Sequence, residues 1–456
     1  MLKKPAPEQT ALEMVTLDGL VPQDHLLRKI DAVIDFSFIH PLVEGLYCPD
    51  NGRPALDPTL LFKALFIGYL FGIRSERQLV REIQVNVAYR WFLRLKLGDK
   101  VFDASTLSQN RRRRFNDTDV AQAIFDRIVE QAIDKGLVDG TVLYTDSTHL
   151  KANANKGKYD LAMIEKSRAD YWADLDRAIE AERVAHGQKP LKRRAREPRA
   201  KETKVSRTDP DAGYMVRDGK PKGFFYLDHR TVDGKLGIIT DTHTTPANVH
   251  DSIVYLDRLD RARARFGLDV KAVGLDAGYA TTGIAKGLED RDILGVTGYR
   301  QPTPPKPGMM GKKAFVYERE VDAYRCPNGQ HLFYSTTDRN GYRHYRSDPA
   351  ICRSCPLLAS CTSNAKAERT ITRHVWTDHR ERTDGHRLTA WGKAIYRRRK
   401  ETVERSFADA KQLFGHRYAR FRGLIGVKNQ CLLAAAAQNI KKIAMALAPR
   451  PGTRPA

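Results

Sequence analysis

Residues 140–156 read GTVLYTDSTHLKANANK, and this stretch decides how the chain is expected to fold. Val142, Leu143 and Tyr144 form a short apolar run that predicts a buried β-strand, with Asp146 at its end. The stretch therefore predicts an acidic side chain at a strand end, where it can reach other parts of the chain.

A second acid stands in the same position further along the chain. Residues 268–280 read LDVKAVGLDAGYA, and the apolar residues from Val270 to Leu275 predict another buried strand. This strand stops at Asp276 and gives way to Gly278. Asp146 and Asp276 are therefore both expected at strand ends.

A third acid lies in residues 396–415, YRRRKETVERSFADAKQLFG, which contain neither glycine nor proline before Gly415. The run predicts one helix with an apolar stripe that must face the core, made of Val403, Phe407, Ala410 and Phe414. Glu404 falls on a second stripe, about 80° around this helix, with Arg397, Lys400 and Lys411. Glu401 points nearly opposite the core stripe, which suits a solvated role, so Glu404 is the stronger candidate ligand.

Three carboxylates at Asp146, Asp276 and Glu404 supply the hard oxygen ligands that Mg²⁺ or Mn²⁺ prefers. Two such ions about 4 Å apart can activate a water or a 3′-hydroxyl and stabilise the leaving oxygen of a phosphodiester. Without cations the cluster is unfavourable, because two like charges at 4 Å repel by about 4 kcal/mol at an effective dielectric near 20. Taken singly, each acid could equally be an ordinary strand-end or surface carboxylate.

The motifs together resemble those of the DDE transposases of bacterial insertion sequences, in the same order. They are YTDSTHLKANANK, TPANVHDS, VGLDAGYA and VERSFADAKQLFGHRYARFRG, and the likeness covers most of the chain. The resemblance implies that Asp146, Asp276 and Glu404 are the catalytic triad. It also implies an α/β fold with a ribonuclease-H-like, mixed five-stranded sheet flanked by helices, joined to an all-α N-terminal domain and carrying two insertions.

One signature of that family, Tyr-x2-Arg-x3-Glu-x6-Lys, is kept only in part when it is anchored on Glu404. Lys411 matches, but Lys400 stands where the pattern has arginine and Arg397 where it has tyrosine, with Tyr396 one place away. Lys411 lies about 10.5 Å along the helix from Glu404 at about 1.5 Å per residue. It is therefore expected to contact a phosphate instead of neutralising Glu404.

Charge predicts a nucleic-acid partner. The chain has 78 Lys and Arg against 55 Asp and Glu, a formal charge of +23, and a pI near 9.7. Much of this charge is clustered, in residues 111–114, 191–207 and 396–400, although such blocks can also be merely solvated or flexible. The residues expected to contact DNA are Arg111, Arg112, Arg113, Arg114, Arg397, Lys400, Lys411, Arg417, Arg420 and Arg422.

Residues 1–138 are predicted to form a helical DNA-binding domain of helix-turn-helix type, with a helical oligomerisation domain as the alternative. Residues 139–300 and 387–449 are expected to form the catalytic domain. Residues 156–207 are predicted to be a charged helical and basic insertion, and residues 450–456 a disordered tail. The longest apolar runs are too short to span a bilayer, so we expect a cytoplasmic, nucleoid-associated protein and no membrane.

A second insertion, residues 301–386, holds four of the six cysteines. Cys326, Cys352, Cys355 and Cys361 include a Cys-x2-Cys pair and predict a structural zinc site, with His331 as an alternative ligand. Disulfides are not expected in the cytosol. Cys48 and Cys431 lie in apolar sequence and are expected to be inert.

The sequence thus predicts a transposase that binds the inverted ends of its element and target DNA, cleaves strands with Mg²⁺ or Mn²⁺, and joins 3′-hydroxyls to the target. Two active sites acting on two ends favour a homodimer. Two other functions stay open from the residues alone. One is a ribonuclease-H-like nuclease or resolvase without strand transfer, and the other is a catalytically silent DNA-binding regulator.

Overall fold

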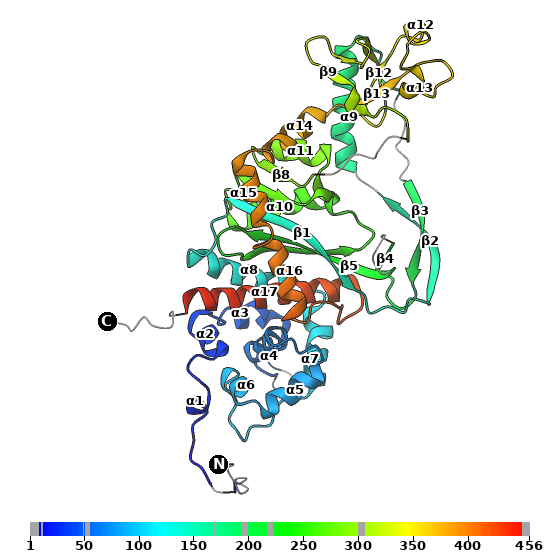
Figure 1. Ribbon diagram of the computed structural model, residues 1–456. Helices are drawn as coiled ribbons and strands as arrows, with labels where there is room; N and C mark the ends of the chain where they lie inside the picture. The colour runs from blue at the N-terminus through cyan, green and yellow to red at the C-terminus, as the bar shows by residue number, and fades with distance from the viewer. Residues whose placement is uncertain are drawn as a thin grey trace, which may run out of the picture.

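The computed structural model describes residues 9–448 except 11, 49, 51–54, 167–168, 193–198, 217–221 and 300–305. Helices surround a mixed sheet, which confirms the α/β class (Figure 1). None of the helices in the described residues is both long and apolar enough to cross a membrane. The predicted disordered tail, residues 450–456, lies outside the described residues.

The main sheet is built around one central strand, β1. The strands of this sheet pair in the order β4-β5-β1-β7-β8, and β6 pairs with β5 as well. β1 is antiparallel to β5 and parallel to β7, which is itself parallel to β8. The strands are β1 (Val142–Lys151), β4 (Gly213–Met215), β5 (Gly223–Asp233), β6 (Ile239–Pro246), β7 (Ala272–Leu275) and β8 (Leu294–Thr297).

Strand β1 is longer than its apolar run predicts, so Asp146 lies inside the strand and not at its end. The reason is the unequal length of the neighbours. β5 pairs with β1 from Leu143 to Lys151, whereas β7 pairs with it only as far as Thr145. Asp146 therefore lies where the parallel half of the sheet stops, although the strand continues.

The two faces of the sheet pack against different helices. Leu143, Val273 and Leu275 face α10 (Tyr255–Phe266) and α11 (Thr282–Glu289) in one core. Tyr144 and Ala272 belong to a second core that includes residues of α15 (Ala390–Arg398) and α16 (Val403–Gln412). Because side chains alternate along a strand, even-numbered residues of β1 face α15 and α16.

The region from residue 17 to residue 134 is helical. Its helices begin at capping side chains that the sequence signals, among them Asp57, Ser75 and Asp103, each of which accepts a hydrogen bond from a backbone N–H of its helix. The helices are α1 (Leu17–Leu20), α2 (Leu26–Val33), α3 (Ile39–Val43), α4 (Pro58–Leu70), α5 (Glu76–Val85), α6 (Val87–Phe92), α7 (Ala104–Asn110) and α8 (Val120–Asp134). A π-helical turn, Arg111–Phe115, follows α7.

The long apolar helix α17 (Leu424–Leu447) covers the sheet, as its sequence predicts. Figure 1 shows it (red) between the sheet and the blue N-terminal helices. Asn439 fixes it to the sheet, since its side-chain amide hydrogen-bonds both the N–H and the carbonyl of Ile239 at 2.8 Å. Buried residues of α2, α4, α8, α17 and β6 form one continuous core. The N-terminal helices therefore share their core with the sheet.

Residues 306–374, here called the cysteine lobe, form a separate five-stranded antiparallel sheet in the order β13-β12-β11-β10-β9. Its core is small and aromatic, with Phe315, Tyr324 and Tyr345 packed around Leu332 and Ile371. The elements are β9 (Val316–Glu318), β10 (Ala323–Arg325), β11 (His331–Thr337), β12 (Tyr342–Arg346), α12 (Pro349–Cys352), α13 (Leu358–Cys361) and β13 (Thr370–His374). Helix α14 (Thr377–His386) leads back to α15.

The first insertion contains the predicted helix, α9 (Ala169–Ala185), and also a strand pair that the sequence does not signal. β2 (Tyr159–Lys166) pairs antiparallel with β3 (Arg199–Ser206). Leu175 and Ile179 of α9 pack on Trp376, and Glu182 lies 3.2 Å from Arg343 of the cysteine lobe. The two insertions therefore pack together, with residues 193–198 of the basic run outside the described part.

Candidate active site

Asp146 and Asp276 lie side by side at the point where β7 ends. Thr145 and Leu275 form the last register pair between β1 and β7, and each acid is the next residue on its strand. Neighbouring strands are about 4.8 Å apart, so two consecutive in-register residues face the same side of the sheet. A backbone N–H also fixes the side chain of Asp276, because its carboxylate accepts a 2.7 Å hydrogen bond from the N–H of Gly278.

The predicted continuous helix from Tyr396 to Phe414 is wrong. α15 ends at Arg398 and α16 begins at Val403, with a turn between them. The break lies at Thr402, whose backbone (φ −105°, ψ −94°) is not helical and whose hydroxyl donates to the carbonyls of Arg398 (2.8 Å) and Arg399 (3.4 Å). Arg397 and Lys400 therefore precede α16 and do not share one helical stripe with Glu404 and Lys411. Both are exposed.

Glu404 keeps its predicted place because α16 starts immediately before it. Val403, Phe407 and Ala410 are buried against the sheet, which confirms the core stripe. Glu404 is in the first turn of α16 with its side chain 46% exposed, and Glu401 is solvated, as expected. Figure 1 shows α15 and α16 (orange) over the sheet beside β1.

Arg399 links the acids, and the sequence did not single it out. One of its guanidinium nitrogens, Nη2, lies 2.8 Å from Oδ2 of Asp146, and the other, Nη1, lies 3.8 Å from Oε1 of Glu404. The Arg399 side chain is only 5% exposed. Arg399 therefore lies between Asp146 and Glu404, and Asp276 lies beside Asp146 on the neighbouring strand. The oxygens of the three carboxylates do not all lie within 4.8 Å of one another.

The pKa of Asp146 is raised from 3.8 to about 6. Burial is the largest cause, and the charges of Asp276 and Asp251 raise it further. Arg399 and the N–H of Ser147 act in the opposite direction but do not compensate. The site is therefore short of positive charge even with Arg399 in place.

Asp251 braces this site. Its carboxylate accepts a 2.8 Å hydrogen bond from the hydroxyl of Ser147, the neighbour of Asp146. His250 serves as a cap, with Nδ1 accepting from the N–H of Ser252. Neither residue has to take part in the chemistry to explain its position.

The tyrosine and the arginine of the family signature are both present, each one position before the place that the pattern gives it when it is anchored on Glu404. Tyr396 and Arg399 keep the Tyr-x2-Arg spacing, and the guanidinium of Arg399 lies 5.4 Å from the centre of the Tyr396 ring. The turn before α16 adds one residue, because the N–H of Glu404 donates to the carbonyl of Arg399 five residues earlier. The intact Tyr-x2-Arg spacing was the signal in the sequence that would have identified Arg399.

The basic residues that are expected to contact DNA have different environments. Arg111 pairs with Glu76 and stacks on Phe421, while Arg114 donates to Asn110 at 2.7 Å. Arg112 and Arg113 are exposed.

In the loop before α17, the guanidinium of Arg420 lies 4.4 Å from the centre of the Tyr69 ring, with two nitrogens buried. Arg417 and Arg422 are exposed, and each donates to a backbone carbonyl. Arg420 thus joins the N-terminal helices to this loop.

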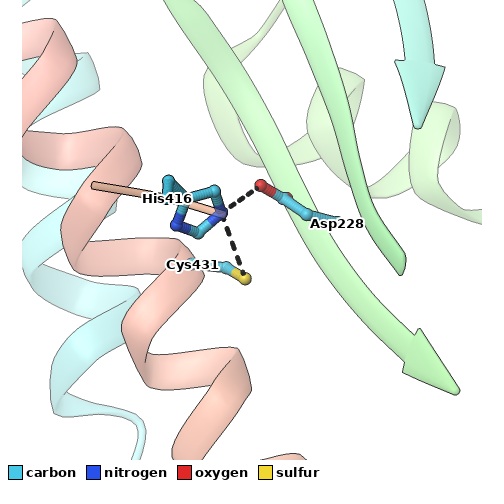
Figure 2. Close-up of side chains that lie close together, drawn as sticks. All are labelled: Asp228, His416 and Cys431. Carbon is cyan, nitrogen blue, oxygen red and sulfur yellow. Dashed lines mark hydrogen bonds and ion pairs between the residues drawn. The ribbon is translucent and has the colours of Figure 1, made fainter. Parts of the chain in front are cut away.

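Asp228 of β5, His416 of the loop after α16 and Cys431 of α17 form a second, fully buried cluster (Figure 2). Nε2 of His416 lies 2.9 Å from Asp228 and 3.9 Å from the Cys431 sulfur. The same Asp228 oxygen also accepts from Arg230 at 2.9 Å. A metal ion here would have to sit beside the Arg230 guanidinium without solvent access, so we interpret the cluster as a buried hydrogen-bond network.

This network supports the helix that carries Glu404. Arg230 pairs in register with Asp146 across β1 and β5, donates to Ser406 of α16 at 3.3 Å, and lies over the Phe407 ring. Arg230 and His416 hold the pKa of Asp228 well below its usual range against the effect of burial. Burial raises the pKa of Cys431, which keeps its thiol protonated and agrees with the expected inert role.

Two segments of the chain match known families. Residues 15–113 match a family described as Transposase domain (DUF772), and residues 325–444 match one described as Transposase DDE domain. Both matches are to transposase families, and they support a DDE transposase of an insertion sequence. The second match includes Glu404 and most of the cysteine lobe, whereas Asp146 and Asp276 lie between the two matched segments. No curated protein sequence matches this transposase significantly.

Proposed function

We propose that Asp146, Asp276 and Glu404 are the catalytic acids of this transposase, and that they act in DNA cleavage and strand transfer. The observation that carries the proposal is that Arg399 pairs with Asp146 of β1 and with Glu404 in the first turn of α16, while Asp276 lies next to Asp146 at the end of β7. More than a hundred residues separate each of these acids from the next in the sequence. Their meeting is therefore a property of the fold.

The order of the strands supports a ribonuclease-H-like catalytic domain. Leaving aside the short β4, the sheet reads β6-β5-β1-β7-β8, with the first three strands antiparallel and the last two parallel to β1. This topology puts the first strand in the middle and brings the ends of β1 and β7 together. It agrees with the fold that the family resemblance implies.

The carboxylates fit divalent cations, because Mg²⁺ and Mn²⁺ prefer hard oxygen ligands. Burial, with the nearby charges of Asp276 and Asp251, raises the pKa of Asp146, and a bound cation would favour its ionised form. When bound, such ions supply activation of a water or 3′-hydroxyl and stabilisation of the leaving oxygen. Asp146 and Asp276 would hold them from the sheet, where β1 and the Gly278 N–H fix their positions. Glu404 would close the site from α16, since its exposed side chain can move toward the sheet.

Arg399 contributes a fixed positive charge beside Asp146, and it keeps the carboxylate ionised before cations bind. Arg397, at the end of α15, and Lys400, in the turn that follows, are exposed close to Arg399, in the position where they can contact phosphates. Arg112 and Arg113 offer a second exposed basic pair after α7. We propose these residues, with Lys411, Arg417 and Arg422, as the DNA contacts. Element ends and target DNA are the proposed substrates, bound by a homodimer.

The proposal is tested with purified protein, DNA carrying the element ends, and Mg²⁺ or Mn²⁺. Joined products support transposition, whereas cleavage without joining would make the protein a nuclease or resolvase. Binding without cleavage would make it a DNA-binding regulator.

Each of Asp146→Asn, Asp276→Asn and Glu404→Gln should abolish cleavage and leave DNA binding intact. Glu401→Gln is the matched control, because Glu401 is an exposed acid three residues from Glu404. Wild-type cleavage by any of the three variants would remove that residue from the site.

A further inference from the structure

Cys326 sits in a tight turn that presents its side chain beside the sheet of the cysteine lobe. The turn joins β10 to β11 and is closed by two backbone hydrogen bonds of Cys326. Its N–H donates to the carbonyl of Gln330 (2.8 Å), and its carbonyl accepts from the N–H of Gly329 (2.9 Å). Gly329 has φ +77°, a conformation that favours glycine. Backbone geometry therefore fixes where this cysteine lies.

The other three cysteines come from the loop between β12 and β13. Cys352 ends α12, and its carbonyl accepts a 3.1 Å hydrogen bond from the N–H of Cys355. Cys361 ends α13, where its N–H donates to the carbonyl of Leu357. These helices have only four residues each, so little in the loop itself holds them in place.

All four cysteines line one cavity of about 40 Å³. This volume exceeds the roughly 10–15 Å³ that a single water requires, so the space admits an ion. None of the four is in a disulfide. The cavity therefore has four free sulfurs from two separate segments around an opening of suitable size.

We infer that Cys326, Cys352, Cys355 and Cys361 bind one structural zinc ion that fastens the α12–α13 loop to the turn between β10 and β11. Zinc in structural sites takes four ligands in a tetrahedron, with Zn–S distances of about 2.3 Å. The sulfurs are not yet that close, because no three of them lie within 4.8 Å of one another. Changes of side-chain rotamer, with the fixed turn at Cys326 as anchor, bring them together.

The surroundings favour four thiolates over a set that includes His331. Nε2 of His331 is 2.8 Å from the carboxylate of Glu318, so that ring nitrogen is occupied. Four thiolates around Zn²⁺ leave a net negative charge, and Arg369 lines the same cavity. It donates to the carbonyls of Cys361 (2.8 Å) and Met310 (3.0 Å), which holds its positive charge next to the site.

The zinc would stabilise the lobe and would not take part in the reaction. The lobe has a small core, and its four-residue helices contribute no fully buried residues. A metal that closes the loop supplies the missing stability, as in other small metal-bound units. Because α9 contacts the lobe through Glu182 with Arg343 and through Arg183 with Thr336, the effect should extend to the first insertion.

The test uses the full-length protein, produced with zinc in the medium and freed of loosely bound metal by gel filtration. Elemental analysis should find about one zinc per chain. Cys355→Ser should lose most of it, whereas Cys48→Ser should keep it, because Cys48 is exposed and lies outside the lobe. Absence of zinc from the wild-type protein, or unchanged zinc in Cys355→Ser, would overturn the inference.

A spectroscopic measurement keeps the test decisive if Cys355→Ser does not fold. Replacement of zinc by Co²⁺ in the wild-type protein should give thiolate-to-cobalt charge-transfer absorption and the intense visible bands of tetrahedral cobalt. Cobalt spectra without thiolate bands would reject the four-cysteine site. Asp146→Asn should retain the zinc, which separates this site from the proposed catalytic metals.

Discussion

The guanidinium of Arg399 lies 2.8 Å from the carboxylate of Asp146, and both side chains are largely buried. The pair joins the turn between α15 and α16 to the middle of β1. It therefore fixes the start of the helix that carries Glu404 relative to the strand that carries Asp146. Arg399 acts through the acids that it positions, and we regard it as a positioning residue.

Arg399→Gln should destabilise the protein by about 1–3 kcal/mol at pH 8 without divalent metal, because the Asp146 carboxylate loses its charged partner in a buried place. Urea unfolding measures the change. The loss should be smaller at pH 4.5, where Asp146 is neutral. Arg405→Gln is the control, since Arg405 is exposed on α16 and pairs with Asp409 at the surface. Equal losses in the two variants would contradict a special role for Arg399.

The pKa of Asp146 predicts a pH dependence of stability. Its value in the folded protein, about 6, lies above the unfolded value of 3.8, so folding favours the protonated acid. Stability from this residue is complete below pH 3.8 and is lost as pH rises to 6, by on the order of 3 kcal/mol. The difference in unfolding free energy between wild type and Asp146→Asn, measured without metal, should show this fall. Asp269→Asn, at an exposed acid, should not change the pH profile.

Gly298 allows the Tyr396 hydroxyl to approach the backbone beside Asp276. A Cβ at Gly298 would lie 2.7 Å from that hydroxyl and 2.8 Å from the N of Ala277, which is backbone and cannot turn away. Gly298→Ala should therefore displace the Asp276 loop and lower cleavage at least tenfold while DNA binding persists. Gly267→Ala is a control for stability alone, because nothing surrounds a Cβ there. Full cleavage by Gly298→Ala would show that the loop tolerates the shift.

Much of the site follows from local sequence. Asp276 terminates its strand as predicted, Ser75 and Asp103 cap helices, and the apolar stripe of α16 is buried. These features depend on neighbouring residues, so periodicity and capping signals report them. The expectation for Asp146 failed in one respect, because the length of β1 is set by pairing with β5, which lies about eighty residues later.

The remaining features depend on contacts that no local pattern records. The break before α16 lies at one residue with a non-helical backbone, Thr402, and helical periodicity continues through it. Asp228, His416 and Cys431 come from β5, a loop and α17, so only the fold brings them together. The packing of α9 on the cysteine lobe likewise joins two insertions that the sequence presents as independent.

Removing one partner from the buried pair of Asp228 and Arg230 should lower the stability of the protein far more than removing one partner from an exposed pair. Asp228→Asn leaves the Arg230 charge unpaired in the core, at zero exposure, and should cost about 3–5 kcal/mol of stability. Asp160→Asn, which removes an exposed partner of Arg207, should cost no more than about 1 kcal/mol. Chemical unfolding measures both. Loss of a bound metal in Asp228→Asn, with stability unchanged, would instead support a metal site at this cluster.

The four consecutive arginines at 111–114 should divide into two functional pairs. Arg112 and Arg113 are exposed, so alanine at either should leave stability unchanged and weaken DNA binding. For each lost phosphate contact, the slope of log K against log salt should fall by about 0.9.

Arg111→Ala should behave in the opposite way, because Arg111 pairs with Glu76 and stacks on Phe421 between the N-terminal helices and the loop before α17. It should lower stability by about 1–3 kcal/mol, with little change in the salt slope. Binding titrations over a range of salt concentrations and urea unfolding of the same variants distinguish the two pairs. If the salt slope is unchanged when Arg112 and Arg113 are both replaced by alanine, the turn Arg111–Phe115 does not contact DNA. The turn between α15 and α16 would then be the main basic contact.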